Sequence, residues 1–417
     1  MTFREALALY RAGALDEERA REVREAIDRE DALLEYMAER DALPEAELGP
    51  DPAEDGPSQS EEAFQAAVNR GIRRAFLRLG TIVGAVLLSV LLLVLFVLPH
   101  AVDLFYYDPG ATAGSLRTDH GSYETNRMSL DMAVYSELFL PGAYRENVRV
   151  LDRGYGEYDI VVVQNVTPTG LPFVDVAGHL RQGELLFYDP NAFKRPFDNA
   201  FEWCVNLPDP ARSLSEQIPG PSTDEDGVTT LWSMGMAGYP DLAREALDAL
   251  PSGTLCRAWV SLDRVMDYES FAAFLDREET GSVWCAVQLG EKPGYSPNIG
   301  FCTDGSGGGG NLLCWDFDRY PALKSCFSRP DGGGAFSSIQ TGEQAAAHLG
   351  DLLAYMDDHA AFYAMMTGEA RSFGPERAWL SQHGVSVYGF SLVADRETLL
   401  RLQDCPEVYA AAAQPLR

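Results

Sequence analysis

Basic residues are scarce in this sequence. Of its 417 residues, 33 are lysine or arginine and 63 are aspartate or glutamate, which gives a formal net charge of −30 at pH 7. A protein that binds nucleic acid directly needs lysine and arginine to displace the counterions of the phosphate backbone. The composition therefore argues against direct nucleic-acid binding.

Motifs for catalysis or metal binding are also missing. The chain contains no G-x-S-x-G, S-x-x-K, H-E-x-x-H or C-x-x-C sequence, so the usual nucleophile and zinc patterns are absent. The glycine-rich stretch TDGSGGGGN (303–311) lacks the Lys-Ser/Thr of a phosphate-binding loop. We therefore expect no enzymatic activity, no cofactor and no bound metal.

The six histidines are scattered along the chain. His348 and His359 fall in EQAAAHLGDLLAYMDDHAAFYAMM (343–366), which the pattern predicts as one long amphipathic helix. Two residues eleven positions apart on a helix are three turns apart, too far to bind one ion. We expect surface or packing roles for them, and a solvated helix face for the acids Asp351, Asp357 and Asp358.

One long apolar run stands out. Residues Leu79 to Leu98 carry no formal charge, and about 20 apolar residues are needed to cross the hydrocarbon core of a bilayer. The mean hydropathy of −0.15 is too low for a chain with many spans. Because 78 residues precede the run, a cleaved signal peptide is disfavoured. The sequence predicts a single transmembrane helix within residues 69–100, with membrane lipid as a partner.

The flanks of this run predict its direction. Positive residues stay on the cytoplasmic side of a membrane, and four arginines precede the run, namely Arg70, Arg73, Arg74 and Arg78. The N-terminus is therefore expected in the cytoplasm and residues 101–417 outside it, with Phe105, Tyr106 and Tyr107 in an interfacial aromatic belt. Gly80 and Gly84 form a G-x-x-x-G motif, which leaves a homodimer possible.

The segment before the arginines predicts a helical hairpin over residues 1–43. Thr2 and Glu5 form a capping box, and apolar residues recur at helical spacing at Phe3, Leu7, Tyr10, Val23, Ile27 and Leu34. A hairpin of this size buries too little surface to be stable alone, so it either packs on itself or docks a partner. Residues 44–68, rich in proline and acid, are expected to form a disordered tether.

All seven cysteines follow the apolar run, where an oxidising exterior would permit disulfides. Cys302, Cys314 and Cys326 flank the glycine-rich stretch and are candidates for a disulfide that closes it. The alternative for cysteines in this chain is a buried thiol, and the apolar context SVWCAVQL predicts that state for Cys285.

Beyond the span, the patterns predict an α+β fold with helices packed on one face of a sheet. Residues 101–250 form a β-rich part, with strands at 157–166 and 181–189. Residues 251–417 form an α+β part. In that part CRAWVSL, SVWCAVQL and VSVYGFSLV predict strands, Asp267 caps the helix of DYESFAAFL, and a further helix runs from Asp395 to about Leu402.

Three regions in this order resemble a known family. ALALYRAGALDEERAREVREAI, the arginine-led apolar run, and AWVSLDRVMDYESFAAFL with VYGFSLVADRETLLRLQDCPEVYAAA are similar to bacterial membrane-bound sigma factor regulators, which have N- and C-terminal regulator modules. The resemblance implies a transmembrane anti-sigma factor. Its cytoplasmic helices would sequester an extracytoplasmic-function sigma factor, and its outer domain would respond to the state of the envelope.

One feature departs from many anti-sigma factors, which carry a His/Cys zinc motif in the cytoplasmic domain. Residues 1–99 contain neither histidine nor cysteine, so metal or redox control of that domain is in doubt. An alternative also stays open: a membrane-anchored extracytoplasmic binding or scaffold protein without a role in transcription. Such a protein would keep its partners when only residues 100–417 are present.

Overall fold

The computed structural model of the chain divides into two units, Met1–Ala85 and Val86–Arg417, which are described separately here. The described residues are 21, 59–118, 121–168, 170–199, 213–217, 222–223, 229–230, 240–291, 298–303, 316, 318–323 and 339–416. The predicted hairpin of residues 1–43 lies outside them apart from Arg21, as do residues 44–58 of the predicted tether.

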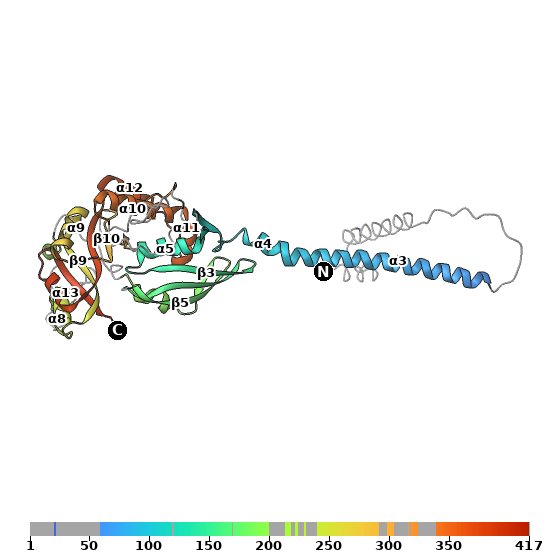
Figure 1. The fold of residues 1–417 in the computed structure, drawn as a ribbon, viewed down its shortest axis with the longest axis horizontal. Helices are drawn as coiled ribbons and strands as arrows, with labels where there is room; N and C mark the ends of the chain where they lie inside the picture. Colours follow the sequence, from blue (N-terminus) through green and yellow to red (C-terminus); the bar gives the residue numbers. More distant parts are fainter. Residues whose placement is uncertain are drawn as a thin grey trace. The chain divides into compact units, whose positions relative to one another are not determined.

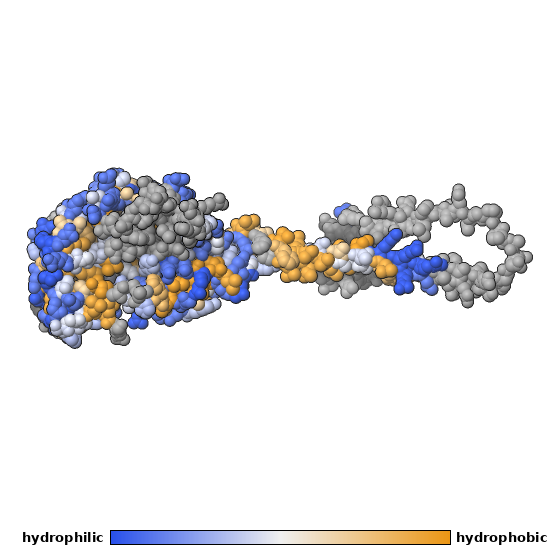
Figure 2. Space-filling view, viewed as in Figure 1, coloured by the Kyte–Doolittle hydropathy of each residue, from blue (hydrophilic) through white to orange (hydrophobic). Residues whose placement is uncertain are grey.

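A long helix, α3 (Gln59–Leu92), carries the apolar run. It continues as a π-helical turn, η1 (Leu93–Val97), and then as α4 (Leu98–Asp103). Within it, Val68–Val97 is long and apolar enough to cross a membrane. Its apolar side chains are exposed, and Figure 2 shows stretches of hydrophobic surface along this helix. Because α3 begins at Gln59, residues 59–68 of the predicted tether are helical.

The π-helical turn changes the hydrogen bonding at the end of this helix. The N–H of Leu98 donates to the carbonyl of Leu93, five residues back, instead of to that of Val94. The next residue, Pro99, has no N–H to donate. The carbonyl of Val94 is therefore left without its usual donors from the following turn.

The first part of the Val86–Arg417 unit contains a β-hairpin and a four-stranded antiparallel sheet in the order β3-β4-β5-β6. The hairpin is β1 (Thr112–Thr118) with β2 (Gly121–Asn126), and the sheet strands are β3 (Arg145–Gly154), β4 (Glu157–Thr167), β5 (Gly170–Arg181) and β6 (Glu184–Phe187). The strand predicted at 157–166 is confirmed. The one predicted at 181–189 is wrong in extent, because a turn at Gln182 and Gly183 separates β5 from a shorter β6.

The second sheet is antiparallel and has the order β11-β10-β12-β9-β13. Its strands are β9 (Leu255–Asp267), β10 (Trp284–Val287), β11 (Gly300–Phe301), β12 (Ser386–Asp395) and β13 (Val408–Pro415). Alternation along β10 sends Cys285 into the main core and Trp284 into a smaller cluster with Trp259 and Tyr388. The predicted α+β class is thus confirmed as a mixture of helix and sheet.

Helices α8 (Pro240–Asp248), α9 (Tyr268–Arg277) and α13 (Arg396–Gln403) pack against strands of this second sheet. The other helices of this part are α10 (Gly342–Asp358), which packs against α5 (Arg127–Phe139) and α9, and α11 (Ala360–Thr367) and α12 (Gly374–His383), which both pack against α10. The predicted caps are confirmed, because Asp267 accepts from the N–H of Ser270 and Asp395 from that of Thr398. Rings of Phe271 and Phe274 on α9 pack against Phe390 of β12.

The single helix predicted over 343–366 is wrong. The backbone leaves helical geometry at His359, with φ −113° and ψ 34°, and α10 gives way there to α11. Figure 1 shows these two helices near α5 (Arg127–Phe139). The remaining short elements are α6 (Pro190–Lys194), η2 (Arg195–Phe197), α7 (Leu214–Gln217), β7 (Ser222–Thr223) and β8 (Thr229–Thr230).

Candidate functional site: a buried acid–histidine helix

Helix α5 is buried on all sides although it carries charge. Its N-cap Asn126 accepts from the N–H of Ser129, and every residue from Met128 to Phe139 is buried. Two of these are carboxylates, Asp131 and Glu137, with 0% and 1% of their surface exposed. Fully buried aspartate and glutamate are rare in proteins unless they are paired. Both carboxylates of α5 have partners from a distant part of the chain.

Asp131 accepts hydrogen bonds from three side chains. The hydroxyl of Tyr107 lies 2.5 Å from one carboxylate oxygen, and that of Tyr355 lies 2.6 Å from the other. His359 Nδ1 contacts the same oxygen as Tyr355. Burial, followed by the negative charge of Asp131, raises the pKa of both tyrosines well above the ordinary value. The tyrosines therefore stay protonated and serve as donors.

The contacts of Tyr107 correct one expectation. We predicted Tyr107 in an interfacial aromatic belt with Phe105 and Tyr106, and Phe105 is indeed 85% exposed. Tyr107 instead packs against the main core and bonds to Asp131. It lies four residues after Asp103, the end of α4. The segment that leaves the apolar helix is thus tied to a buried carboxylate of α5.

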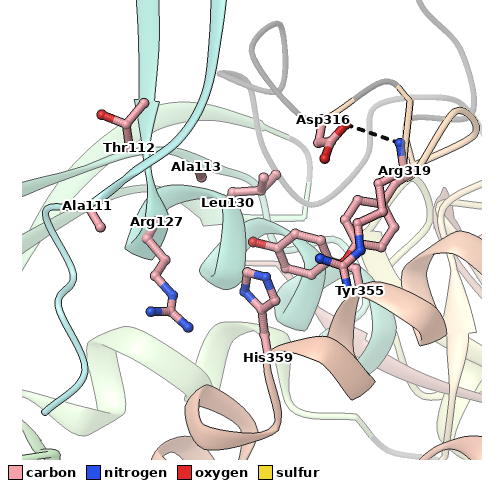
Figure 3. A pocket seen from close by; sticks show the side chains of 10 residues that line it. Ala111, Thr112, Ala113, Arg127, Leu130, Asp316, Arg319, Tyr355 and His359 are labelled. Carbon is pink, nitrogen blue, oxygen red and sulfur yellow. Dashed lines mark hydrogen bonds between the residues drawn. The ribbon is translucent and has the colours of Figure 1, made fainter. Parts of the chain in front are cut away.

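His359 lies in the wall of a pocket of about 270 Å³. Figure 3 shows its ring beside Tyr355, with Arg127 and Arg319 on either side. The pocket is lined by Ala111, Thr112, Ala113, Arg127, Leu130, Asp316, Arg319, Tyr320, Tyr355 and His359.

Positive and negative side chains around this pocket oppose one another, and the negative ones are slightly more numerous. Arg319 pairs with Asp358 at 2.7 Å, and Arg127 Nε lies 3.8 Å from Asp131. Asp316 adds a further negative charge in the lining. The two arginines are thus opposed by three carboxylates, so the electrostatics of the pocket do not favour an anion.

Glu137 forms the second buried pair of α5. Its Oε1 lies 2.7 Å from Nε2 of His348 on α10, and both side chains are 1% exposed. The other ring nitrogen, Nδ1, lies 2.8 Å from the carbonyl oxygen of Ala322. A carbonyl accepts only, so both nitrogens face acceptors, and the doubly protonated imidazolium fits both contacts.

The pKa of His348 is accordingly raised. Burial acts to lower it and is the largest single influence, but the charge and hydrogen bond of Glu137, the Ala322 carbonyl and the charge of Asp351 together outweigh burial. Of the surface and packing roles expected for His348 and His359, the packing role is confirmed, because the rings lie against Phe301 and Tyr355, but the pairing of each histidine with a carboxylate of α5 was not expected.

The expectation of a solvated helix face is wrong for Asp351 and Asp357, which are partly buried, and is confirmed for Asp358, which is exposed. Asp351 accepts from the N–H of Ala322, and Asp357 from the N–H of Phe373. Asp358 accepts from the hydroxyl of Tyr320 at 2.6 Å. These carboxylates fix the segments that pack beside α10.

The C-terminal end of α5 is also bound to the second sheet. The indole Nε1 of Trp284 on β10 donates to the carbonyl oxygen of Glu137 at 2.7 Å. The N–H of Cys302 lies 3.4 Å from the Glu137 carboxylate. Helix α5, encoded in the first part of the unit, therefore has polar contacts in the second part as well as in its own, where the N–H of Val148 donates to Ser129 Oγ at 2.8 Å.

The raised pKa of His348 predicts the pH dependence of stability. Its contribution should be fully present below the unfolded-state pKa near 6.5 and lost as pH rises through the higher folded-state pKa. We expect the thermal midpoint of the full chain in detergent to fall from pH 6 towards alkaline pH. The fall should be smaller in His348→Gln, whose side chain does not titrate. A midpoint that rises over this range, or an equal fall in both proteins, would contradict the assignment.

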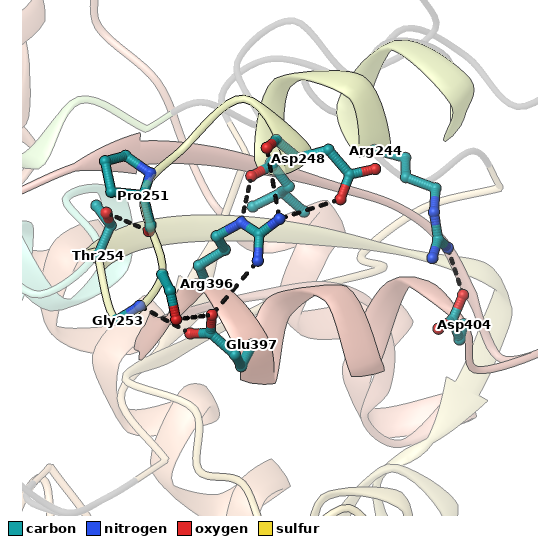
Figure 4. A network of polar contacts seen from close by, with 10 residues as sticks. Arg244, Asp248, Pro251, Gly253, Thr254, Arg396, Glu397 and Asp404 are labelled. Atoms are coloured by element: carbon teal, nitrogen blue, oxygen red, sulfur yellow. Dashed lines mark hydrogen bonds and ion pairs between the residues drawn. The ribbon is translucent and has the colours of Figure 1, made fainter.

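A polar network joins α8 to α13 (Figure 4). Arg396 Nε donates to the carbonyl of Leu247 at 2.9 Å. Glu397 accepts from the hydroxyl of Ser252 and the N–H of Gly253, and these bonds lower its pKa. The residues before β9 are thereby attached to the last helix of the chain, so the second part of the unit begins at α8.

The structure describes some of the residues that the sequence analysis predicted as site residues, and others lie outside it. Phe3, Leu7, Tyr10, Val23, Ile27 and Leu34 lie outside the described residues, so their partner-binding role stays a prediction. Arg70, Arg73, Arg74 and Arg78 lie exposed on α3, and their role at a membrane interface stays a prediction. Cys302 is buried, but Cys314 and Cys326 lie outside the described residues, so the disulfide also stays a prediction. Cys285 is a buried free thiol, as expected.

Sequence reasoning missed Asp131 and Glu137. The available signal was two acids within RMSLDMAVYSELF, a helix that is otherwise mostly apolar or small. Such acids are usually assigned to a solvated face. The sequence also gives no signal that pairs these acids with His348 and His359, which lie more than 200 residues further along the chain. Among the described residues, no group of three His, Cys, Asp or Glu side chains is arranged to hold a metal ion.

Comparison with known proteins identifies one region. Residues 247–414 match the family described as "Sigma factor regulator C-terminal". The match begins at Leu247, whose carbonyl accepts from Arg396 in the network that joins α8 to α13. No curated protein and no solved structure matches the chain.

Proposed function

We propose that this protein is a membrane-anchored anti-sigma factor that holds an extracytoplasmic-function sigma factor through residues 1–43. The observation that carries the proposal is the match of residues 247–414 to the C-terminal domain of sigma factor regulators. The apolar helix Val68–Val97 supports a membrane anchor, and its arginine flank favours a cytoplasmic N-terminus. The role is regulatory rather than catalytic.

Sequestration would act through binding free energy. A sigma factor held with a Kd near 1 nM is stabilised by about 12 kcal/mol against release. The apolar stripe of the hairpin would supply most of this affinity, while its acidic residues would steer the basic surface of the sigma factor towards it.

The contacts of Tyr107 support a route from the outer unit to the span. The chain leaves α4 at Asp103 and is held by Tyr107 to Asp131, which also binds Tyr355 and His359 of the C-terminal module. A change in the envelope that alters how α5 packs in the second part of the unit would therefore reach the end of the apolar helix within a few residues.

Co-purification tests the sigma-binding role. The full chain, purified in mild detergent, is expected to bring a sigma factor with it, and a variant lacking residues 1–43 is not. Replacing the apolar pair Val23 and Ile27 with aspartate should weaken binding by about thirtyfold or more, since hot-spot residues contribute about 2 kcal/mol or more.

Glu22→Gln is the matched control on the same predicted helix. It should change mainly the association rate, because charges at the rim of an interface steer association more than they add affinity. Retention of the sigma factor by residues 100–417 alone would instead support the scaffold alternative and refute the proposal.

A further inference from the structure

The carbonyl group of Val94 lies inside the apolar run, where an unpaired polar group is costly. Leu98 donates to Leu93 instead, and Pro99 has no N–H. Val94 precedes Leu98, the end of the apolar run, by four residues, which is about 6 Å at helical rise. In lipid no water is present to satisfy an exposed carbonyl, so a partner must come from the protein.

That partner is a side chain far away in the sequence. The hydroxyl of Tyr155 donates to the Val94 carbonyl oxygen at 2.6 Å. Tyr155 lies at the tip of the β3–β4 hairpin, and Figure 1 shows β3 extending towards α4. A strand of the folded unit therefore reaches back along the helix to a residue within the apolar run.

The backbone of the hairpin tip adopts an unusual conformation that places Tyr155 at this contact. Tyr155 has a φ of +60°, which a bulky residue rarely adopts, and glycines with positive φ precede and follow it. The N–H of Gly156 donates to Asp103 at the end of α4 at 2.6 Å. A Cβ on Gly156 would lie 2.9 Å from the ring of Tyr106, so only glycine allows this approach.

The neighbourhood of the tip suits a membrane interface. Leu104 and Phe105 follow α4 and are 86% and 85% exposed. The turn between β5 and β6 is held beside the tip, because the N–H of Gln182 donates to the carbonyl of Gly156 at 2.7 Å. Tyrosine is enriched at the boundary between hydrocarbon and headgroups.

We propose that the β3–β4 hairpin tip is embedded in the bilayer, with Tyr155 satisfying the Val94 carbonyl among lipids of the leaflet on the C-terminal side. The folded unit is thus seated directly on the membrane and is not held away from it on a stalk. The partner is the lipid surface itself. This inference rests on the proposed membrane anchoring of the apolar helix.

Photocrosslinking in the full chain tests the position of the tip. The photoreactive residue p-benzoylphenylalanine replaces Tyr155 in one protein, Leu88 of the apolar run in a second, and Leu255 in a third. Leu255 is 46% exposed at the start of β9 and is the matched surface control. Each protein is placed in nanodiscs of phosphatidylethanolamine and phosphatidylglycerol, illuminated, and examined by mass spectrometry for lipid adducts.

Positions 155 and 88 are expected to give lipid adducts of comparable yield, and position 255 only background. Adducts at 88 with none at 155 would overturn the embedded tip and leave the anchor intact. A lack of adducts at 88 would refute the membrane anchor itself, and the embedded tip with it.

The hydroxyl of Tyr155 is tested separately. Tyr155→Phe keeps the ring and removes the donor to Val94, so the amides of residues 93–98 should exchange with deuterium faster in nanodiscs. Tyr188→Phe is the control, since Tyr188 is 68% exposed. An unchanged exchange rate in Tyr155→Phe would overturn the role of this hydroxyl at the π-helical turn.

Discussion

Replacing Glu137 with alanine is expected to lower the free energy of unfolding of the Val86–Arg417 unit by about 3–5 kcal/mol. The change leaves the imidazolium of His348 buried without its carboxylate, and an unpaired buried charge is strongly destabilising. It also removes the acceptor beside the N–H of Cys302. Chemical denaturation of the full chain in detergent, followed by tryptophan fluorescence, measures the loss.

Two further proteins make this result specific. The double variant Glu137→Leu with His348→Leu removes both charges and should recover much of the loss, because a buried ion pair often contributes little compared with apolar residues of similar volume. Glu146→Ala alters an exposed glutamate on β3 and should stay within about 0.5 kcal/mol of the original protein. A loss below about 1 kcal/mol for Glu137→Ala would contradict the buried pair.

Asp131→Ala is expected to have the second large effect. It would leave the hydroxyls of Tyr107 and Tyr355 and Nδ1 of His359 without their acceptor. Each buried donor left unsatisfied costs about 1–3 kcal/mol, so a total loss of at least about 3 kcal/mol is expected in the same denaturation experiment.

Asp131→Asn is the control that keeps the size and shape of the side chain. Asparagine keeps one carbonyl oxygen as an acceptor and fills the same space, so it should lose less than half as much stability as alanine. Equal losses in the two variants would contradict the expectation that one acceptor oxygen at this position retains most of the stability.

Local signals in the sequence predicted much of the fold. The apolar run, the strands β4, β9, β10 and β12, and the aspartate caps of α9 and α13 each depend on residues close together in the chain. The break at His359 was missed because no glycine or proline marks it in the sequence. Its ring contacts Asp131, so long-range pairing accompanies the end of α10 there.

The candidate site could not be predicted for the same physical reason. Periodicity identifies which face of a helix is apolar, but it does not reveal that a second helix will supply imidazoles to acids placed within that face. The π-helical turn could not be predicted either, because an apolar run gives no signal for where such a turn occurs. Pro99 was visible in the sequence, but the donor from Tyr155 depends on the geometry of a hairpin more than fifty residues away.

The burial of α5 has a consequence for how the chain matures. Asp131 and Glu137 precede their histidine partners by 228 and 211 residues. Such contacts of high sequence separation form late, and large chains pass through incomplete states before they do. If residues 101–417 are exported as we propose, Asp131 and Glu137 leave the membrane before residues 348 and 359. Both carboxylates would then stay hydrated and unpaired until most of the chain has been translocated. A nascent chain halted before residue 348 would therefore remain a target for quality-control proteases.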